Sequence, residues 1–86
     1  MLKILKFGAA WCGPCKSLNP IILEISKETG IDITHYDADE HGDICSQYKV
    51  KAVPTLIFLK DDIEVDRKTG LISKENLKEL IEKYNG

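Results

Sequence analysis

Two cysteines separated by two residues, Cys12 and Cys15, are the side chains of this 86-residue sequence best suited to chemistry. If a helix begins near Cys12, residues three positions apart lie on one face of it, with Cβ atoms about 5 to 6 Å apart. A small local adjustment then allows a disulfide bond to form and to open again. The spacing therefore predicts reversible thiol–disulfide exchange between the two sulfur atoms.

The start of a helix would also activate the first of the two thiols. Unpaired backbone N–H groups and the positive end of the helix dipole favour a thiolate at Cys12. The dipole contributes only about 0.3 to 1 kcal/mol, so hydrogen bonds to the sulfur must supply the rest of the activation. Pro14 suits the first helical turn, where no backbone donor is needed, and Gly13 leaves the approach to Cys12 open.

These properties predict a reaction in two steps. The Cys12 thiolate attacks a substrate disulfide and forms a mixed disulfide, and Cys15 then attacks Cys12 and releases the reduced substrate. We expect Cys15 to be the resolving cysteine because it is tethered and buried beneath its partner. The redox-active disulfide itself would serve in place of a cofactor.

Zinc binding is the alternative chemistry for closely spaced cysteines. A structural zinc site needs four ligands, and only Cys45 and His41 are candidates to join the close pair. Because no second close pair of ligands is present, we expect no metal site. We interpret Cys45 as a small hydrophobic residue on the buried side of a helix, with a regulatory or dimer-forming thiol as the alternative.

Composition describes an ordinary globular protein with a single domain over residues 1–86. The formal charge of −2, with lysines mixed among acidic residues, argues against the basic stripe that nucleic-acid binding requires. No apolar stretch approaches the ~20 residues of a membrane span, and the amino terminus does not resemble a signal peptide. With an odd number of cysteines, three, these features predict a cytoplasmic protein in a reducing compartment, and we expect a monomer.

The hydrophobic pattern predicts the element order β-α-β-α-β-β-α, an α/β fold. Strands are expected over residues 2–7, 31–36, 55–59 and 63–68, and helices over 12–29, 40–48 and from 74 onward. The first two strands, joined through a helix, should be parallel, and the last two should form an antiparallel hairpin. A four-stranded mixed sheet flanked by helices follows, with Ser73 as the N-cap of the last helix.

Several short motifs occur in a specific order along nearly the whole chain. They are Trp11-Cys12-Gly13-Pro14-Cys15-Lys16, then Pro20, then Ala52-Val53-Pro54-Thr55, and then Thr69-Gly70. Together they resemble the thioredoxin family. The resemblance implies a thioredoxin-like fold that lacks the N-terminal strand and helix of the family, and the reduction of protein disulfides through a reversible Cys12–Cys15 disulfide.

The resemblance also implies the surroundings and the partners of the cysteine pair. Pro54 would be a cis-proline placed against the disulfide, with Gly13 and Pro14 supporting the pair. The substrate groove would be formed by Trp11, Val53, Pro54, Gly70 and Leu71. The implied partners are thioredoxin reductase or a similar electron donor and disulfide-containing proteins, with ribonucleotide reductase as one candidate.

Three positions depart from the pattern of the family. Lys6 stands where a buried aspartate is usual, Gly8 where an aromatic residue is common, and His35 where a lysine often accompanies that aspartate. Lys6 could favour the Cys15 thiolate or accept its proton, but we expect it to extend to solvent instead. His35 could relay protons, but we expect a partly exposed strand histidine without that role.

Two other functions stay open on the sequence alone. A glutaredoxin-like protein reduced by glutathione is favoured by the short chain and disfavoured by Gly13-Pro14 between the cysteines. A non-catalytic subunit could use the groove around Trp11 and Pro54 to dock a partner, and such a role would not require the cysteines.

Overall fold

The computed structural model describes residues 1–85, which form one four-stranded sheet and three helices. The elements are β1 (Leu2–Gly8), α1 (Gly13–Thr29), β2 (Asp32–Asp37), α2 (Gly42–Gln47), β3 (Thr55–Lys60), β4 (Ile63–Thr69) and α3 (Lys74–Asn85). The predicted order β-α-β-α-β-β-α is confirmed. The second helix is shorter than predicted, because the N–H groups of Glu40 and His41 donate to the Asp37 carbonyl in a turn, at 3.1 and 2.8 Å.

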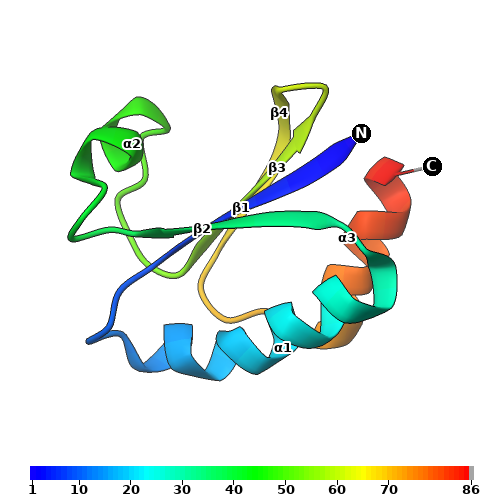
Figure 1. Cartoon of the computed structure of the whole chain (residues 1–86), viewed down its shortest axis with the longest axis horizontal. Coiled ribbons are helices and arrows are strands. Elements are labelled where there is room, and N and C mark those ends of the chain that lie inside the picture. Colours follow the sequence, from blue (N-terminus) through cyan, green and yellow to red (C-terminus); the bar gives the residue numbers. More distant parts are fainter. Residues whose placement is uncertain (86) are drawn as a thin grey trace.

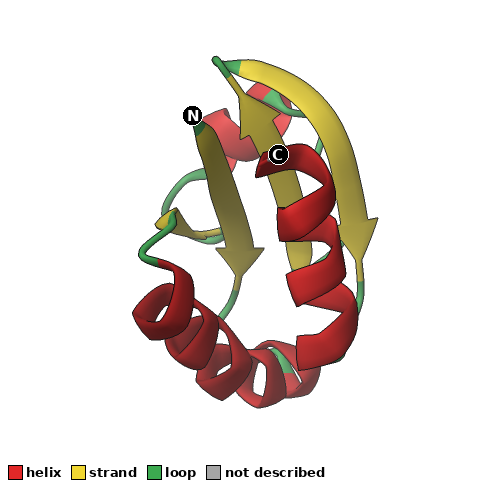
Figure 2. Ribbon diagram, turned by 90° about the vertical axis from the view of Figure 1, so that its right-hand side faces the viewer, coloured by secondary structure: helices red, strands yellow, loops and turns green. Residues whose placement is uncertain are grey.

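The sheet has the strand order β2-β1-β3-β4. β1 runs parallel to β2 and antiparallel to β3, and β3 and β4 form the antiparallel hairpin. The predicted mixed sheet is therefore confirmed. Figure 1 shows α1 and α3 on one side of this sheet and α2 on the other, and Figure 2 shows α3 in front of the strands that it covers.

Both faces of the central strand β1 are buried, because successive side chains of a strand point to opposite faces. Leu2 and Ile4 pack in the cluster beneath α1 and α3, whereas Leu5 and Phe7 pack in the cluster beneath α2. The same alternation places Lys6 on the face covered by α1. The chain therefore leaves the core at the end of β1 and reaches the start of α1, where the cysteines lie.

The last helix begins where its capping residue predicts. The Ser73 hydroxyl accepts a hydrogen bond from the Asn76 backbone N–H at 3.1 Å, which satisfies one of the unpaired donors at the helix start. Leu77 and Ile81 form the buried stripe of α3 and pack in the cluster with α1. This packing holds α3 beside the helix that carries the cysteines.

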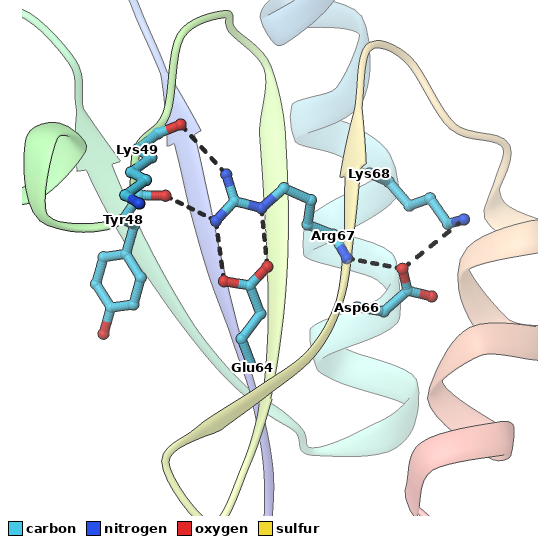
Figure 3. A network of polar contacts seen from close by, with 6 residues as sticks. All are labelled: Tyr48, Lys49, Glu64, Asp66, Arg67 and Lys68. Atoms are coloured by element: carbon cyan, nitrogen blue, oxygen red, sulfur yellow. Dashed lines mark hydrogen bonds and ion pairs between the residues drawn. The ribbon is translucent and has the colours of Figure 1, made fainter.

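Arg67 on β4 ties the edge of the sheet to the segment that follows α2 (Figure 3). Its guanidinium donates to both carboxylate oxygens of Glu64, each at 2.9 Å, in a bidentate pair. It also donates to the carbonyl oxygens of Tyr48 at 2.7 Å and Lys49 at 3.4 Å. Lys49 has a positive φ of 57°, so these bonds stabilise a backbone turn that is costly for a residue with a side chain.

Replacing Arg67 with Met should lower the free energy of unfolding by about 1 kcal/mol, because four hydrogen bonds to a partly exposed guanidinium are lost. Urea-induced unfolding followed by circular dichroism measures the change. Lys68→Met is the matched control on the same strand, since Lys68 makes only a 3.9 Å ion pair with Asp66. Equal stability of the two variants would contradict this role for Arg67.

Candidate functional site

The cysteine pair lies at the junction between β1 and α1. Cys12 is the N-cap residue of α1, and Cys15 lies in its first turn. A disulfide bond joins them, with Cα atoms 5.3 Å apart. The Cys15 backbone N–H donates to the Cys12 sulfur at 3.2 Å, so one of the free donors at the helix start points at this atom. A thiolate at Cys12 would therefore be stabilised by this hydrogen bond and by the helix dipole.

Both cysteines of the pair are largely buried. Cys12 is 5% exposed and Cys15 is 2% exposed, and both pack with Ala9 and Val53. Trp11, Gly13 and Pro14, by contrast, are exposed around the first cysteine. A partner can therefore approach the disulfide across the exposed segment that surrounds Cys12, the more exposed of the two cysteines.

A second loop meets the cysteines at the same end of the sheet, because the start of β3 pairs with the end of β1. The Val53–Pro54 peptide bond is cis, Pro54 is buried, and Val53 packs against the pair. The Pro54 carbonyl accepts a hydrogen bond from the Gly70 N–H at 2.8 Å. This bond holds the segment after β4, with the exposed Leu71, beside the segment before β3. The structure thus brings Val53, Pro54 and Gly70 together near the disulfide.

Trp11 is 69% exposed but is held in place, because its indole N–H donates to the Asp39 carboxylate at 3.0 Å. A groove of about 270 Å³ lies beside it and is lined by Trp11, Ala38, Cys45, Val50, Lys51, Ala52 and Val53. Sequence reasoning did not identify Asp39 or this wall of the groove. The polar turn that contains Asp39 was visible in the sequence, but its contact with Trp11 depends on how β2 lies beside β1.

Lys6 does not extend to solvent, so the expectation for this residue was wrong. Its side chain is 1% exposed and donates to the Asn19 side-chain oxygen, and its Nζ lies 3.4 Å from the His35 Nδ1. Two exposed polar residues, Asn19 on α1 and His35 on β2, therefore cover the amine. Burial lowers the pKa of Lys6, and no carboxylate among residues 1–85 forms an ion pair with it.

Gly8 creates room for the Lys6 amine next to Cys15. A Cβ atom at Gly8 would lie 3.2 Å from the Lys6 Nζ and 3.5 Å from the Cys15 sulfur. Both atoms therefore border the small space that a side chain at position 8 would fill. Sequence reasoning listed Lys6 and Gly8 as separate departures, but the structure makes them one feature.

His35 lies opposite Lys6 in the parallel register of β1 and β2 and is exposed on its other side. Burial of part of the ring, and then the positive charge of Lys6, lower the pKa of His35, while Asp37 opposes the shift. Asn19, the other contact of Lys6, was not singled out from the sequence. Its position four residues after Cys15 on α1 places it on the same helix face as that cysteine.

Cys45 is a buried free thiol on α2, packed in the cluster with Leu5 and Phe7. Burial, with a smaller contribution from the Asp43 carboxylate, raises the pKa of its thiol. Over the described residues 1–85, no group of three or more cysteine, histidine or acidic side chains is arranged to hold a metal ion. Within the same range, no helix is long and apolar enough to cross a membrane.

The chain is similar to known thioredoxins over almost its whole length. A family model described as Thioredoxin matches residues 1–83. Thioredoxins of Staphylococcus epidermidis and Staphylococcus aureus are 39% identical over 85 residues, which cover 96% of this chain and 82% of each relative. The solved structure of a mutant thioredoxin from Halobacterium salinarum is 35% identical in sequence and has a TM-score of 0.95. This match covers 99% of the present chain and 75% of the Halobacterium chain. Thioredoxin NaTrxh from Nicotiana alata is 37% identical with a TM-score of 0.90, covering 96% of this chain and 72% of that one.

Replacing Lys6 with Met should raise the stability of the protein at neutral pH. The pKa of Lys6 is lower in the folded protein than in the unfolded chain, so protonation of this amine favours unfolding. This penalty is complete below the folded-state pKa and disappears as the pH approaches about 10.4, the value of an unperturbed lysine. The Lys6→Met variant should therefore unfold at higher urea concentration at neutral pH, with an advantage that shrinks in alkaline solution.

Lys3→Met is the matched control, because it removes the same charge from the same strand three residues away. Its unfolding midpoint should stay within error of the parent protein. A Lys6→Met variant that is less stable than the parent at neutral pH would contradict this prediction. The contacts of the amine with Asn19 and His35 would then stabilise the fold by more than its burial destabilises it.

Cys45 should resist alkylation in the folded, oxidised protein, because its thiol is buried and its pKa is raised. Iodoacetamide at neutral pH should add to it only after denaturation, as measured by mass spectrometry. Fast labelling of the native protein would show that the thiol is open to solvent.

Proposed function

Because the chain belongs to the thioredoxin family and is a thiol–disulfide oxidoreductase, we propose that Cys12 is its nucleophile and Cys15 its resolving cysteine. The observation that carries this assignment is the position of Cys12 at the N-cap of α1, with the Cys15 N–H pointing at its sulfur. The exposed residues around Cys12 support it further, because a partner approaching the pair meets this cysteine first.

The proposed cycle moves two electrons from the protein to its substrate. The Cys12 thiolate attacks one sulfur of the substrate disulfide, that S–S bond breaks, and the other substrate sulfur leaves as a thiolate. The Cys15 thiolate then attacks the Cys12 sulfur, and the electron pair of the mixed disulfide leaves on the remaining substrate sulfur. The substrate ends as a dithiol and the protein as the disulfide seen in the structure.

The substrate is proposed to lie across the groove formed by Trp11, Val53, Pro54, Gly70 and Leu71. Val53 packs against the pair, and the hydrogen bond from the Gly70 N–H to the Pro54 carbonyl holds the two loops together. The exposed Trp11 and Leu71 offer apolar surface to a partner. An extended segment with apolar side chains on either side of its disulfide would fit this surface.

The electron donor we propose is thioredoxin reductase, with which members of this family generally work. Disulfide-containing proteins are the substrate class, and ribonucleotide reductase is one candidate among them. A reducing compartment such as the cytoplasm would keep the pair ready as a dithiol.

Reduction of a protein disulfide such as that of insulin, driven by NADPH and thioredoxin reductase, tests the donor directly. Activity only with glutathione and glutathione reductase would replace this proposal with the glutaredoxin-like alternative.

Changing the two cysteines separately should give two different phenotypes. Cys12→Ser should abolish reduction of the substrate and form no mixed disulfide, because the nucleophile is gone. Cys15→Ser should also lose turnover but should accumulate a mixed disulfide between Cys12 and the substrate, detected on non-reducing gels and by mass spectrometry.

Ser46→Ala is the control for these variants and should keep full reductase activity, because Ser46 is exposed on α2 and lines neither the disulfide nor the groove beside Trp11. Trapped mixed disulfide in Cys12→Ser rather than in Cys15→Ser would reverse the two roles. Activity that survives both substitutions would contradict exchange at this pair.

A further inference from the structure

Lys6 is a buried amine on the central strand of the sheet with only neutral or weakly basic groups in direct contact. Its Nζ bonds to the Asn19 side-chain oxygen and faces the His35 Nδ1 at 3.4 Å. An ammonium held away from water without a carboxylate partner is costly, and a negative charge formed beside it reduces that cost. A thiolate next to Lys6 would therefore supply the counter-ion that the folded chain does not give it.

The amine lies beside the sulfur that must lose a proton in the second step of the cycle. The Lys6 Nζ and the Cys15 sulfur both border the space left by the missing side chain of Gly8. Both residues also line an open cavity of about 330 Å³ with Asn19 and His35. A proton lost by Cys15 can thus leave to solvent through this cavity, while the amine of Lys6 stays beside the sulfur.

We propose that the Lys6 ammonium stabilises the Cys15 thiolate when Cys15 resolves the mixed disulfide, an inference that rests on the proposed function. The S–H bond of Cys15 breaks, and its proton passes to solvent through the open cavity. The Cys15 thiolate attacks the Cys12 sulfur, and the electron pair of the broken mixed disulfide leaves on the substrate sulfur. Lys6 acts through the charge that it places beside the Cys15 sulfur and forms no bond to the substrate.

The other charged groups at this cavity modify the step without replacing Lys6. Asp37 favours the ammonium form, but its carboxylate already accepts a hydrogen bond from the Asp39 N–H at 2.8 Å. Lys16 is exposed on α1 and its charge favours the Cys15 thiolate weakly through solvent. Partial burial and the charge of Lys6 lower the pKa of His35, whose Nδ1 faces the Lys6 amine at 3.4 Å. The face of Lys6 toward α1 is otherwise bordered by Ile22, Leu23 and Ser26.

The ionisation of Cys15 by itself tests the inference. In a Cys12→Ser, Cys45→Ala background, Cys15 is the only thiol, and its pKa is read from the ultraviolet absorbance of the thiolate. Lys6→Met and Lys6→Gln should each raise this pKa by about one unit, because the thiolate loses the positive charge of the ammonium beside it. Lys3→Met removes an equal charge from the opposite face of β1 and should leave the titration unchanged.

The resolving step supplies the second readout, in proteins with both cysteines present. A chromogenic aromatic disulfide reports two releases, the first when Cys12 attacks and the second when Cys15 resolves. Lys6→Met should leave the first release unchanged and slow the second about tenfold at neutral pH, the factor that corresponds to one pKa unit. The difference should close in alkaline solution, where the thiol ionises without help.

Three results would overturn the role of Lys6. They are an unchanged Cys15 titration in both Lys6 variants, an equal shift in Lys3→Met, or a slower second release by the same factor at every pH. If the parent protein showed neither release, the proposed function would fail instead, while the titration of Cys15 would still decide the part played by Lys6.

Discussion

The unpaired backbone N–H groups at the start of α1 are the constraint around which the site is built. A helix cannot satisfy its own first donors, and here the Cys12 sulfur takes one of them. The central strand β1 fixes where that helix starts, because it is paired on both sides and cannot shift its register. The loops at Pro54 and Gly70 then meet the same point from the other strands, joined by a single hydrogen bond.

The parts of the molecule that follow from local sequence were predictable. The apolar run in β3, the cap at Ser73 and the spacing of Cys12 and Cys15 each reflect chemistry within a few residues. These local signals agree with one another, so the element order, the mixed sheet and the exchange chemistry followed from the sequence.

The parts that depend on neighbours distant in sequence were not predictable. Whether Lys6 reaches water depends on Asn19 and His35, which come from a helix and from a parallel strand. A one-residue change in the pairing of β1 with β2 would remove His35 from the amine. The role of Asp39 was not predictable for the same reason, because Asp39 and its partner Trp11 are 28 positions apart in the sequence. A charged residue in a strand is ordinarily predicted to be exposed to solvent. Only the packing of the folded chain shows that Lys6 is buried.

The network around Arg67 also affects how separate copies of the chain meet. β4 is an edge strand, and an unpaired edge is a template on which another chain can add a strand. Glu64, Asp66, Arg67 and Lys68 place charges of both signs along this edge, and pairing would require them to give up water and their present partners. The side chains that hold the backbone turn after α2 therefore also discourage aggregation through the edge of the sheet.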